Sequence, residues 1–217
     1  MAKPFAILVV VASLVALASA SDADPINDYC VADLASKITI NGLACKPASS
    51  AMSEDFAFRG FRKDGDTNNP LGIALAPGFA GINYPGLNTL GFALAKFNYA
   101  KGGLVPPHTH PRAAEVIYVV KGEVHVGFVD TAGKLFATSL KRGDFFVFPK
   151  GLVHFQLNVG SGHAVTISVL NGQNPGVQFS TAVFAAQPSI DTSVLARAFQ
   201  LKDMDVMDLQ TKFKPAA

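Results

Sequence analysis

From residue 90 to residue 184, short apolar or alternating segments are separated by Gly, Pro, Asn and Asp. In the segment 123–129, Val124, Val126 and Phe128 fall on one face, as expected of a strand with one buried side. The run 116–120 is apolar and rich in β-branched residues, which predicts a strand buried on both faces. Further strands are expected at 91–99, 135–140, 145–148, 154–159 and 163–170. Many short strands at this spacing predict an all-β sandwich or barrel.

The regions on either side of these strands have different patterns. The preceding segment, 56–77, is rich in turn residues and reads as loops. After the strands, apolar residues recur twice at helical spacing, first behind the cap candidates Asp191, Thr192 and Ser193 and then after Asp203. These residues are Val194, Leu195, Ala198 and Phe199, then Val206, Leu209 and Phe213. The pattern predicts two short amphipathic helices at about 190–214, whose apolar faces need a surface to pack on.

The first twenty residues read as a secretory signal peptide. Lys3 gives a positive start, residues 5–18 are nearly all apolar, and Ala18-Ser19-Ala20 matches a small-residue cleavage site. A membrane anchor is the alternative, but the apolar run is short for a span. We expect cleavage after Ala20. The mature chain, 21–217, is then long enough for one domain and short for two.

Composition excludes some functions. A chain of 217 residues with a formal net charge of +2 lacks the concentrated positive charge of a nucleic-acid-binding domain. No Ser, His and Asp set suggests a catalytic triad, and neither cysteine looks nucleophilic. Catalysis by a triad or by a thiol nucleophile is therefore not expected.

Candidate metal chemistry lies at the edge of the apolar run 116–120. His108 and His110 are one residue apart, so in a strand both project to the same face. Glu115 follows after Pro111, and His154 can supply a third imidazole if its strand lies nearby. Burying such groups is costly unless something pairs with them, and a divalent metal would do so. Three imidazoles and one carboxylate suit Mn, Fe, Cu or Zn, and the sequence alone does not choose among them.

The other candidates have simpler interpretations. An isolated H-x-H would be read as a solvated pair beside a turn. His125 and His163 are expected to be exposed and inert, and Gly143 with Asp144 to form a turn. Asn158 either supports the site or only satisfies backbone groups, and both interpretations stay open. Four phenylalanines are expected in the core, namely Phe145, Phe146, Phe148 and Phe155.

Two stretches carry a resemblance to a known family. The first reads G-x5-H-x-H-x4-E-x6-G from Gly102 to Gly122, and the second reads G-x5-P-x-G-x2-H-x3-N from Gly143 to Asn158. They resemble the paired motifs of the cupin superfamily, with every fixed position present in order. Segments 27–33, 88–91, 154–160 and 173–176 resemble germins and germin-like proteins of plants. The resemblance covers essentially the whole mature chain.

This resemblance implies a fold and a cofactor. The fold is a cupin jelly-roll barrel at about 88–185, within a single germin-type domain that ends in short helices. The cofactor is manganese, with His108, His110, Glu115 and His154 as its ligands. The resemblance also implies a homo-hexamer built as a trimer of dimers, with the helices clasping a neighbouring subunit. The location implied is the cell wall or apoplast.

Cys30 and Cys45 are the only cysteines in the chain. After secretion, an oxidising compartment allows a bridge between them, and two free or metal-binding thiols are the alternative. Because their spacing resembles the germin pattern, the resemblance implies a disulfide that staples the N-terminal segment.

Activities reported in the family include superoxide dismutation, oxalate oxidation and nucleotide-sugar hydrolysis. In the oxalate-oxidising branch, asparagines line the pocket just before the first motif and inside it. Those places hold Ala95 and Val105 here, which cannot donate a hydrogen bond to a carboxylate. We therefore expect manganese-dependent superoxide dismutase activity, with a role in defence or stress response, and weak or absent oxalate oxidation. The alternative is a non-enzymatic wall, storage or receptor-like protein in which the metal is structural.

Overall fold

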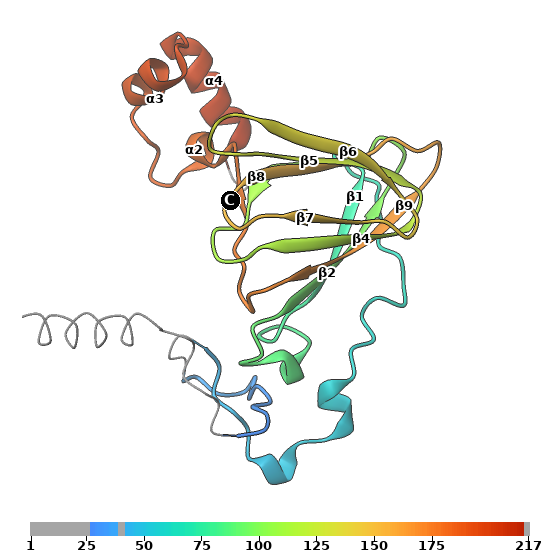
Figure 1. Cartoon of the computed structure of the whole chain (residues 1–217). Coiled ribbons are helices and arrows are strands. Elements are labelled where there is room, and N and C mark those ends of the chain that lie inside the picture. Colours follow the sequence, from blue (N-terminus) through green and yellow to red (C-terminus); the bar gives the residue numbers. More distant parts are fainter. Residues whose placement is uncertain (1–26, 39–41, 215–217) are drawn as a thin grey trace, which may run out of the picture.

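Figure 1 shows the computed structural model, which describes residues 27–38 and 42–214. The expected signal peptide, residues 1–20, and its cleavage after Ala20 lie outside the described residues. Among the residues that are described, no helix has the length and apolar character needed to cross a membrane.

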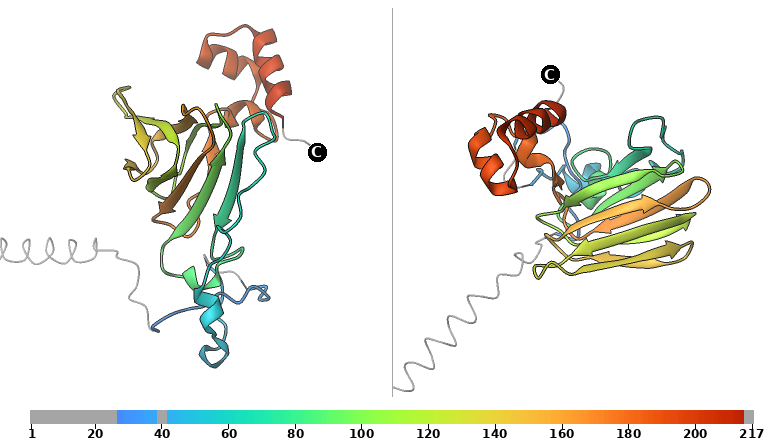
Figure 2. Two further views of the ribbon diagram at one scale, coloured as in Figure 1. Left: turned by 90° about the vertical axis from the view of Figure 1, so that its right-hand side faces the viewer. Right: turned by 90° about the horizontal axis from the view of Figure 1, so that it is seen from above.

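The described residues form two five-stranded sheets in which neighbouring strands are antiparallel. The first sheet has the order β1 (Ile73–Gly78), β2 (Ala93–Tyr99), β9 (Ala164–Leu170), β4 (Glu115–Lys121), β7 (Phe145–Phe148). The second has the order β10 (Gln178–Phe179), β3 (Leu104–Thr109), β8 (Val153–Asn158), β5 (Glu123–Val129), β6 (Leu135–Lys141). The sheets stack as two layers (Figure 2), which confirms the predicted all-β jelly roll.

The main core lies between the two sheets and takes residues from both. Val124 and Val126 of β5 have no exposed surface, and Phe128 packs against them, as their alternation predicts. From the opposite sheet, Tyr99 and Phe148 are also fully buried. Inward positions of both layers therefore interdigitate, as in other sandwiches.

Along β4 and β7, the first sheet has one buried face and one exposed face. This corrects the predictions for the run 116–120 and for Phe145. Ile117 and Val119 have no exposed surface, but Val116 and Val120 are 37% and 36% exposed, so β4 is not buried on both faces. Phe145 is 65% exposed and is not a core residue. The other phenylalanines assigned to the core are fully buried (Phe148) or partly buried (Phe146 and Phe155). Outward positions of β4 and β7 stay accessible in the single chain, as antiparallel sheets allow.

Most predicted strands are present with ends shifted by one or two residues, and β5 and β7 have the predicted bounds. β1 falls inside and just beyond the segment that reads as loops. Its Pro77 argues against a central strand, but β1 is an edge strand, where a missing backbone donor is tolerated.

The predicted C-terminal helices are present as α3 (Thr192–Phe199) and α4 (Asp203–Phe213), after the short α2 (Ala182–Ala185). Asp191 caps α3 by accepting a hydrogen bond from the backbone N–H of Ser193 at 2.8 Å. Leu195, Ala196 and Val206 form a small core of their own. The three helices lie together beside one end of the sandwich (Figure 1).

The N-terminal segment is cross-linked internally by a disulfide and is held to the rest of the chain by hydrogen bonds. Cys30 and Cys45 form a disulfide with their Cα atoms 5.0 Å apart, which confirms the implied pairing. The segment also contains the 3-10 turns η1 (Ala48–Ser50) and η2 (Ser53–Phe56), and η3 (Pro85–Leu87) lies just before β2. The side chain of Asn88 donates to the Leu43 carbonyl at 3.0 Å.

A buried lysine of β2 binds the loop 61–64 through hydrogen bonds. Lys96 is 6% exposed, and its Nζ donates to the carbonyls of Phe61 and Lys63 and to Asp64 Oδ1 at 3.0, 3.2 and 2.6 Å. Asn98 donates to the same Asp64 oxygen at 2.8 Å. A buried charge is stable when it is paired and hydrogen-bonded in this way.

Candidate metal centre

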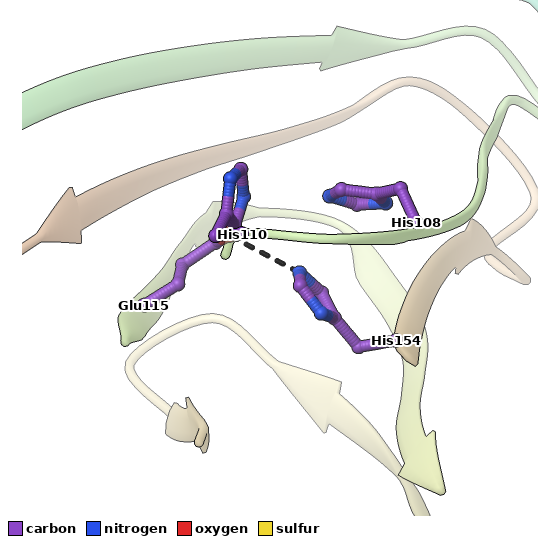
Figure 3. A group of neighbouring side chains, drawn as sticks. All are labelled: His108, His110, Glu115 and His154. Atoms are coloured by element: carbon purple, nitrogen blue, oxygen red, sulfur yellow. Dashed lines mark hydrogen bonds and ion pairs between the residues drawn. The ribbon is translucent and has the colours of Figure 1, made fainter. Parts of the chain in front are cut away.

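Two neighbouring strands and the start of a third bring the candidate ligands together. His108 lies near the end of β3 and is paired with His154 of β8 in the antiparallel register. His110 follows β3 directly, and Glu115 is the first residue of β4 in the opposite sheet. The structure therefore places all four predicted residues at one end of the space between the sheets (Figure 3).

The cluster is compact and shielded from solvent. One ligand atom from each residue can be chosen so that all four lie within 4.8 Å of one another. His108, His110, Glu115 and His154 are 3%, 7%, 2% and 2% exposed. His108 and His110 project to the same side, with ring centroids 5.0 Å apart, as the i, i+2 spacing predicts.

Each imidazole is oriented by a backbone carbonyl. The Nδ1 atoms of His108 and His154 lie 2.8 and 2.9 Å from the carbonyl oxygens of Pro106 and Leu152. Nδ1 of His110 contacts the Gly176 carbonyl. A carbonyl can only accept, so each Nδ1 carries the proton. The three Nε2 atoms are then available as ligands, which is the usual orientation of metal-binding histidines.

The carboxylate of Glu115 uses its two oxygens differently. Oε2 lies 2.9 Å from Nε2 of His110 and 3.4 Å from Nε2 of His154. Oε1 accepts a hydrogen bond from Ser168 Oγ at 2.6 Å and from Gln156 Nε2 at 3.4 Å. Nε2 of His154 is fully buried and has no hydrogen-bond partner among the described residues. Oε2 therefore lies close to the Nε2 atoms of both His110 and His154.

The surroundings shift the protonation of the cluster. Burial and the neighbouring His154 ring lower the pKa of His108 to about 4. Burial acts in the same direction on His110, but hydrogen bonds to Glu115 and to the Gly176 carbonyl raise its pKa above the ordinary value. Burial would raise the pKa of Glu115, yet the His110, His154 and Ser168 contacts hold it well below its usual range. At neutral pH Glu115 is a carboxylate and His108 is a neutral imidazole.

The donor set fits a divalent first-row metal ion. Three imidazole nitrogens and one carboxylate oxygen are ligands that Mn, Fe, Cu and Zn accept. A buried nitrogen without a partner costs free energy, which an ion at this position would recover. The chemistry of the residues and their orientation both match a metal site.

The remaining candidates lie apart from the cluster. His163 is exposed as expected, whereas His125 is only partly exposed and contacts Ser139 Oγ at 3.2 Å. Asn158 donates to the carbonyls of Ala100 and Gly162, both at 2.7 Å. It therefore satisfies backbone groups and does not contact the four clustered residues.

Sequence reasoning missed two residues that contact Glu115. Gln156 follows His154 by two positions in β8, so it projects to the same face, and this spacing could have revealed it. Ser168 occupies an inward position of the apolar strand β9, where a hydroxyl needs a partner. A buried serine at an inward strand position is a weaker signal, because its partner is distant in sequence.

Ala95 and Val105 are the neighbours of these two residues on adjacent strands of the same sheets. Ala95 is paired with Ser168 between β2 and β9, and Val105 is paired with Gln156 between β3 and β8. They are 5% and 4% exposed. Directly paired residues project to the same face of a sheet, so both apolar side chains lie beside the groups that contact Glu115.

Comparisons with known proteins agree with this fold and site. The cupin family matches residues 60–207. Germin-like protein subfamily 2 member 1 of Arabidopsis thaliana is 47% identical over 99% of both chains. The rhicadhesin receptor of Pisum sativum is 47% identical over 89% of both. A solved oxalate oxidase structure aligns with a TM-score of 0.84 and 40% identity, over 89% of this chain and 98% of that one. The chain therefore belongs to the cupin family, and within it to the germin-like proteins.

Proposed function

We propose that this chain is a secreted, manganese-binding germin-like protein of the plant cell wall or apoplast that dismutates superoxide. One observation carries the metal part of the proposal. Four buried ligand atoms, from His108, His110, Glu115 and His154, lie within 4.8 Å of one another. Manganese is the member of the possible metal set that the germin resemblance favours.

The protein's own residues would hold and enclose the ion. The three Nε2 atoms and Oε2 of Glu115 are the proposed ligands, and the carbonyls bonded to each Nδ1 keep the imidazoles in place. Phe179 lies beside the site, with its ring centroid 5.9 Å from that of His108. When bound, a redox-active ion supplies the one-electron exchange by which two superoxide ions and two protons become dioxygen and hydrogen peroxide.

The lining of the site favours a small substrate over oxalate. Oxalate is a dianion, and its two carboxylates need hydrogen-bond donors when they leave water. Ala95 and Val105, which replace the asparagines of the oxalate-oxidising branch, offer none. Each missing hydrogen bond to a charged group costs about 1.5–3 kcal/mol. Superoxide needs mainly an open coordination position. The 40% identity to oxalate oxidase makes oxalate the substrate to test first against this proposal.

A non-enzymatic role is the second candidate. The rhicadhesin receptor of Pisum sativum, whose name describes a receptor, is 47% identical to this chain. In that case the ion would stabilise the fold and the protein would act by binding. The outward positions of β4 and β7, such as Phe145 at 65% exposure, are available for contacts between chains. The proposed homo-hexamer, a trimer of dimers, would use such surfaces.

Secretion is proposed from the signal-peptide pattern of residues 1–20. The Cys30–Cys45 disulfide supports it, because such bonds persist in oxidising compartments. Purified mature protein should therefore begin at Ser21.

One purified sample tests the function. It should be measured for metal content, for removal of superoxide and for hydrogen peroxide release from oxalate, before and after removal of the metal. We expect manganese-dependent removal of superoxide and little activity on oxalate. Manganese-loaded protein that removes superoxide no faster than free manganese would contradict the enzymatic proposal and favour the binding role.

A further inference from the structure

The hydroxyl of Ser168 donates a hydrogen bond to the carboxylate of Glu115. Ser168 has no exposed surface, and its Oγ lies 2.6 Å from Oε1. Among the described residues, Glu115 is the hydrogen-bond partner found for this side chain. Ala95, its partner across the β2–β9 pair, has no polar group to compete for the hydroxyl. Hydrogen bonds from a hydroxyl to a carboxylate at this distance are short and strong.

A free carboxylate can present either oxygen, or both, to a metal ion. In this site Oε1 is taken by Ser168, while Oε2 faces Nε2 of His110 and of His154. The second contact to Oε1, from Gln156 at 3.4 Å, is longer and weaker. Ser168 is therefore the group that fixes which oxygen of Glu115 points toward the imidazoles.

We propose that Ser168 is a positioning residue of the metal centre, which presents Glu115 to the ion through Oε2 alone. This inference rests on the proposed manganese site and adds a residue outside the four ligands. Loss of the hydroxyl would free Oε1 and let the carboxylate rotate. Changes in such supporting hydrogen bonds typically weaken metal affinity by about 10- to 100-fold.

The same strand offers a matched control. Thr166 lies two residues before Ser168 in β9, faces the same side and also has no exposed surface. Its hydroxyl contacts Tyr99 OH at 3.1 Å, not Glu115. Thr166→Val therefore removes a buried hydroxyl from the same face of β9 without touching the carboxylate.

The experiment measures manganese affinity and the electron paramagnetic resonance spectrum of bound Mn(II) in four full-length mature proteins. These are the wild type, Ser168→Ala, Ser168→Thr and Thr166→Val. We expect Ser168→Ala to bind manganese about 10-fold more weakly or worse and to change the spectrum. Ser168→Thr keeps a hydroxyl and should recover affinity and spectrum, and Thr166→Val should match the wild type in both.

The outcomes separate this inference from the proposed function. A wild type that binds no manganese would overturn both. A wild type that binds manganese, with Ser168→Ala equal to it in affinity and spectrum, would overturn the role of Ser168 alone. Equal losses in Ser168→Ala and Thr166→Val would also overturn it, because they would show a general packing effect. Thermal melts of the metal-free proteins check that each variant is folded. If Ser168→Ala is not folded, Ser168→Cys provides the test, because it keeps the shape of the side chain but replaces the hydroxyl by a weakly donating thiol, and it should lose affinity in the same way.

Discussion

His108 and His154 lie directly opposite each other in the β3–β8 pair, with ring centroids 4.2 Å apart. This pairing joins the two motifs, although β5 and β6 lie between them in the sequence. The register of this one strand pair therefore positions two of the four residues of the metal centre. A slip of one residue would turn one imidazole to the other face of the sheet.

The first prediction concerns oxalate. Replacing both Ala95 and Val105 by Asn should strengthen oxalate binding by about one to two orders of magnitude for each hydrogen bond that forms. Binding is measured by inhibition of superoxide removal or by calorimetry. Ala95→Val with Val105→Leu is the control, because it adds bulk without donors. Rapid hydrogen peroxide release from oxalate by the unmodified protein would show that the apolar lining does not exclude this substrate.

The second prediction concerns the disulfide. Replacing Cys30 and Cys45 together by Ser should lower the free energy of unfolding by about 3 kcal/mol on the chain-entropy account. Urea unfolding measures the change, and a reducing agent should then affect the wild type but not the variant. Two thiols that react with an alkylating agent in secreted, unreduced protein would contradict the pairing.

The third prediction concerns pH. Metal binding needs neutral imidazoles, and the Glu115 contact raises the pKa of His110 above its ordinary value, although burial opposes this. In metal-free protein, protonated His110 contributes stability that is present below the unfolded-state pKa of about 6.5 and lost as pH rises through the raised pKa. The stability that bound manganese adds has the opposite pH dependence: it increases as pH rises, because the imidazoles lose their protons and can bind the ion.

The gain in melting temperature on adding manganese should therefore shrink as pH falls from about 8 to about 5. Paired melts of loaded and metal-free protein across this range measure it. A gain that stays constant over the whole range would indicate ligands other than these imidazoles.

The fourth prediction concerns the buried lysine. Lys96→Met should destabilise the protein by about 1–3 kcal/mol, because it leaves the carbonyls of Phe61 and Lys63 without their donor. Lys101→Met, at an exposed turn, is the matched control and should have little effect. Urea unfolding compares the two variants. Equal stability in both would show that the loop 61–64 does not depend on Lys96.

Much of this fold is predictable because its causes are local. β5 and β7 have the predicted bounds, since turn-forming residues flank both ends of each strand. The four clustered residues fall in two motifs with fixed spacing, and the strand register then brings them together. Asp191 also caps α3 as expected, because capping depends only on neighbouring residues.

What the sequence does not reveal depends on distant neighbours. Ser168 contacts Glu115 across 53 positions, so no local spacing marks the pair. Phe145 reads as a core residue but is exposed, because hydrophobicity does not say which face of β7 another layer covers. Pro77 prevents β1 from being predicted, because a proline argues against a central strand. Only the sheet order shows that this strand lies at an edge, where proline is tolerated.

Metal content of ligand variants tests the central claim most directly. Purified wild-type protein should carry close to one manganese per chain by elemental analysis. His110→Ala and His154→Ala should lose it and melt at a lower temperature, because an ion that binds only the native state stabilises that state. His163→Ala, an exposed histidine away from the cluster, should keep its metal. Full manganese content in both His110→Ala and His154→Ala would contradict the proposed ligand set.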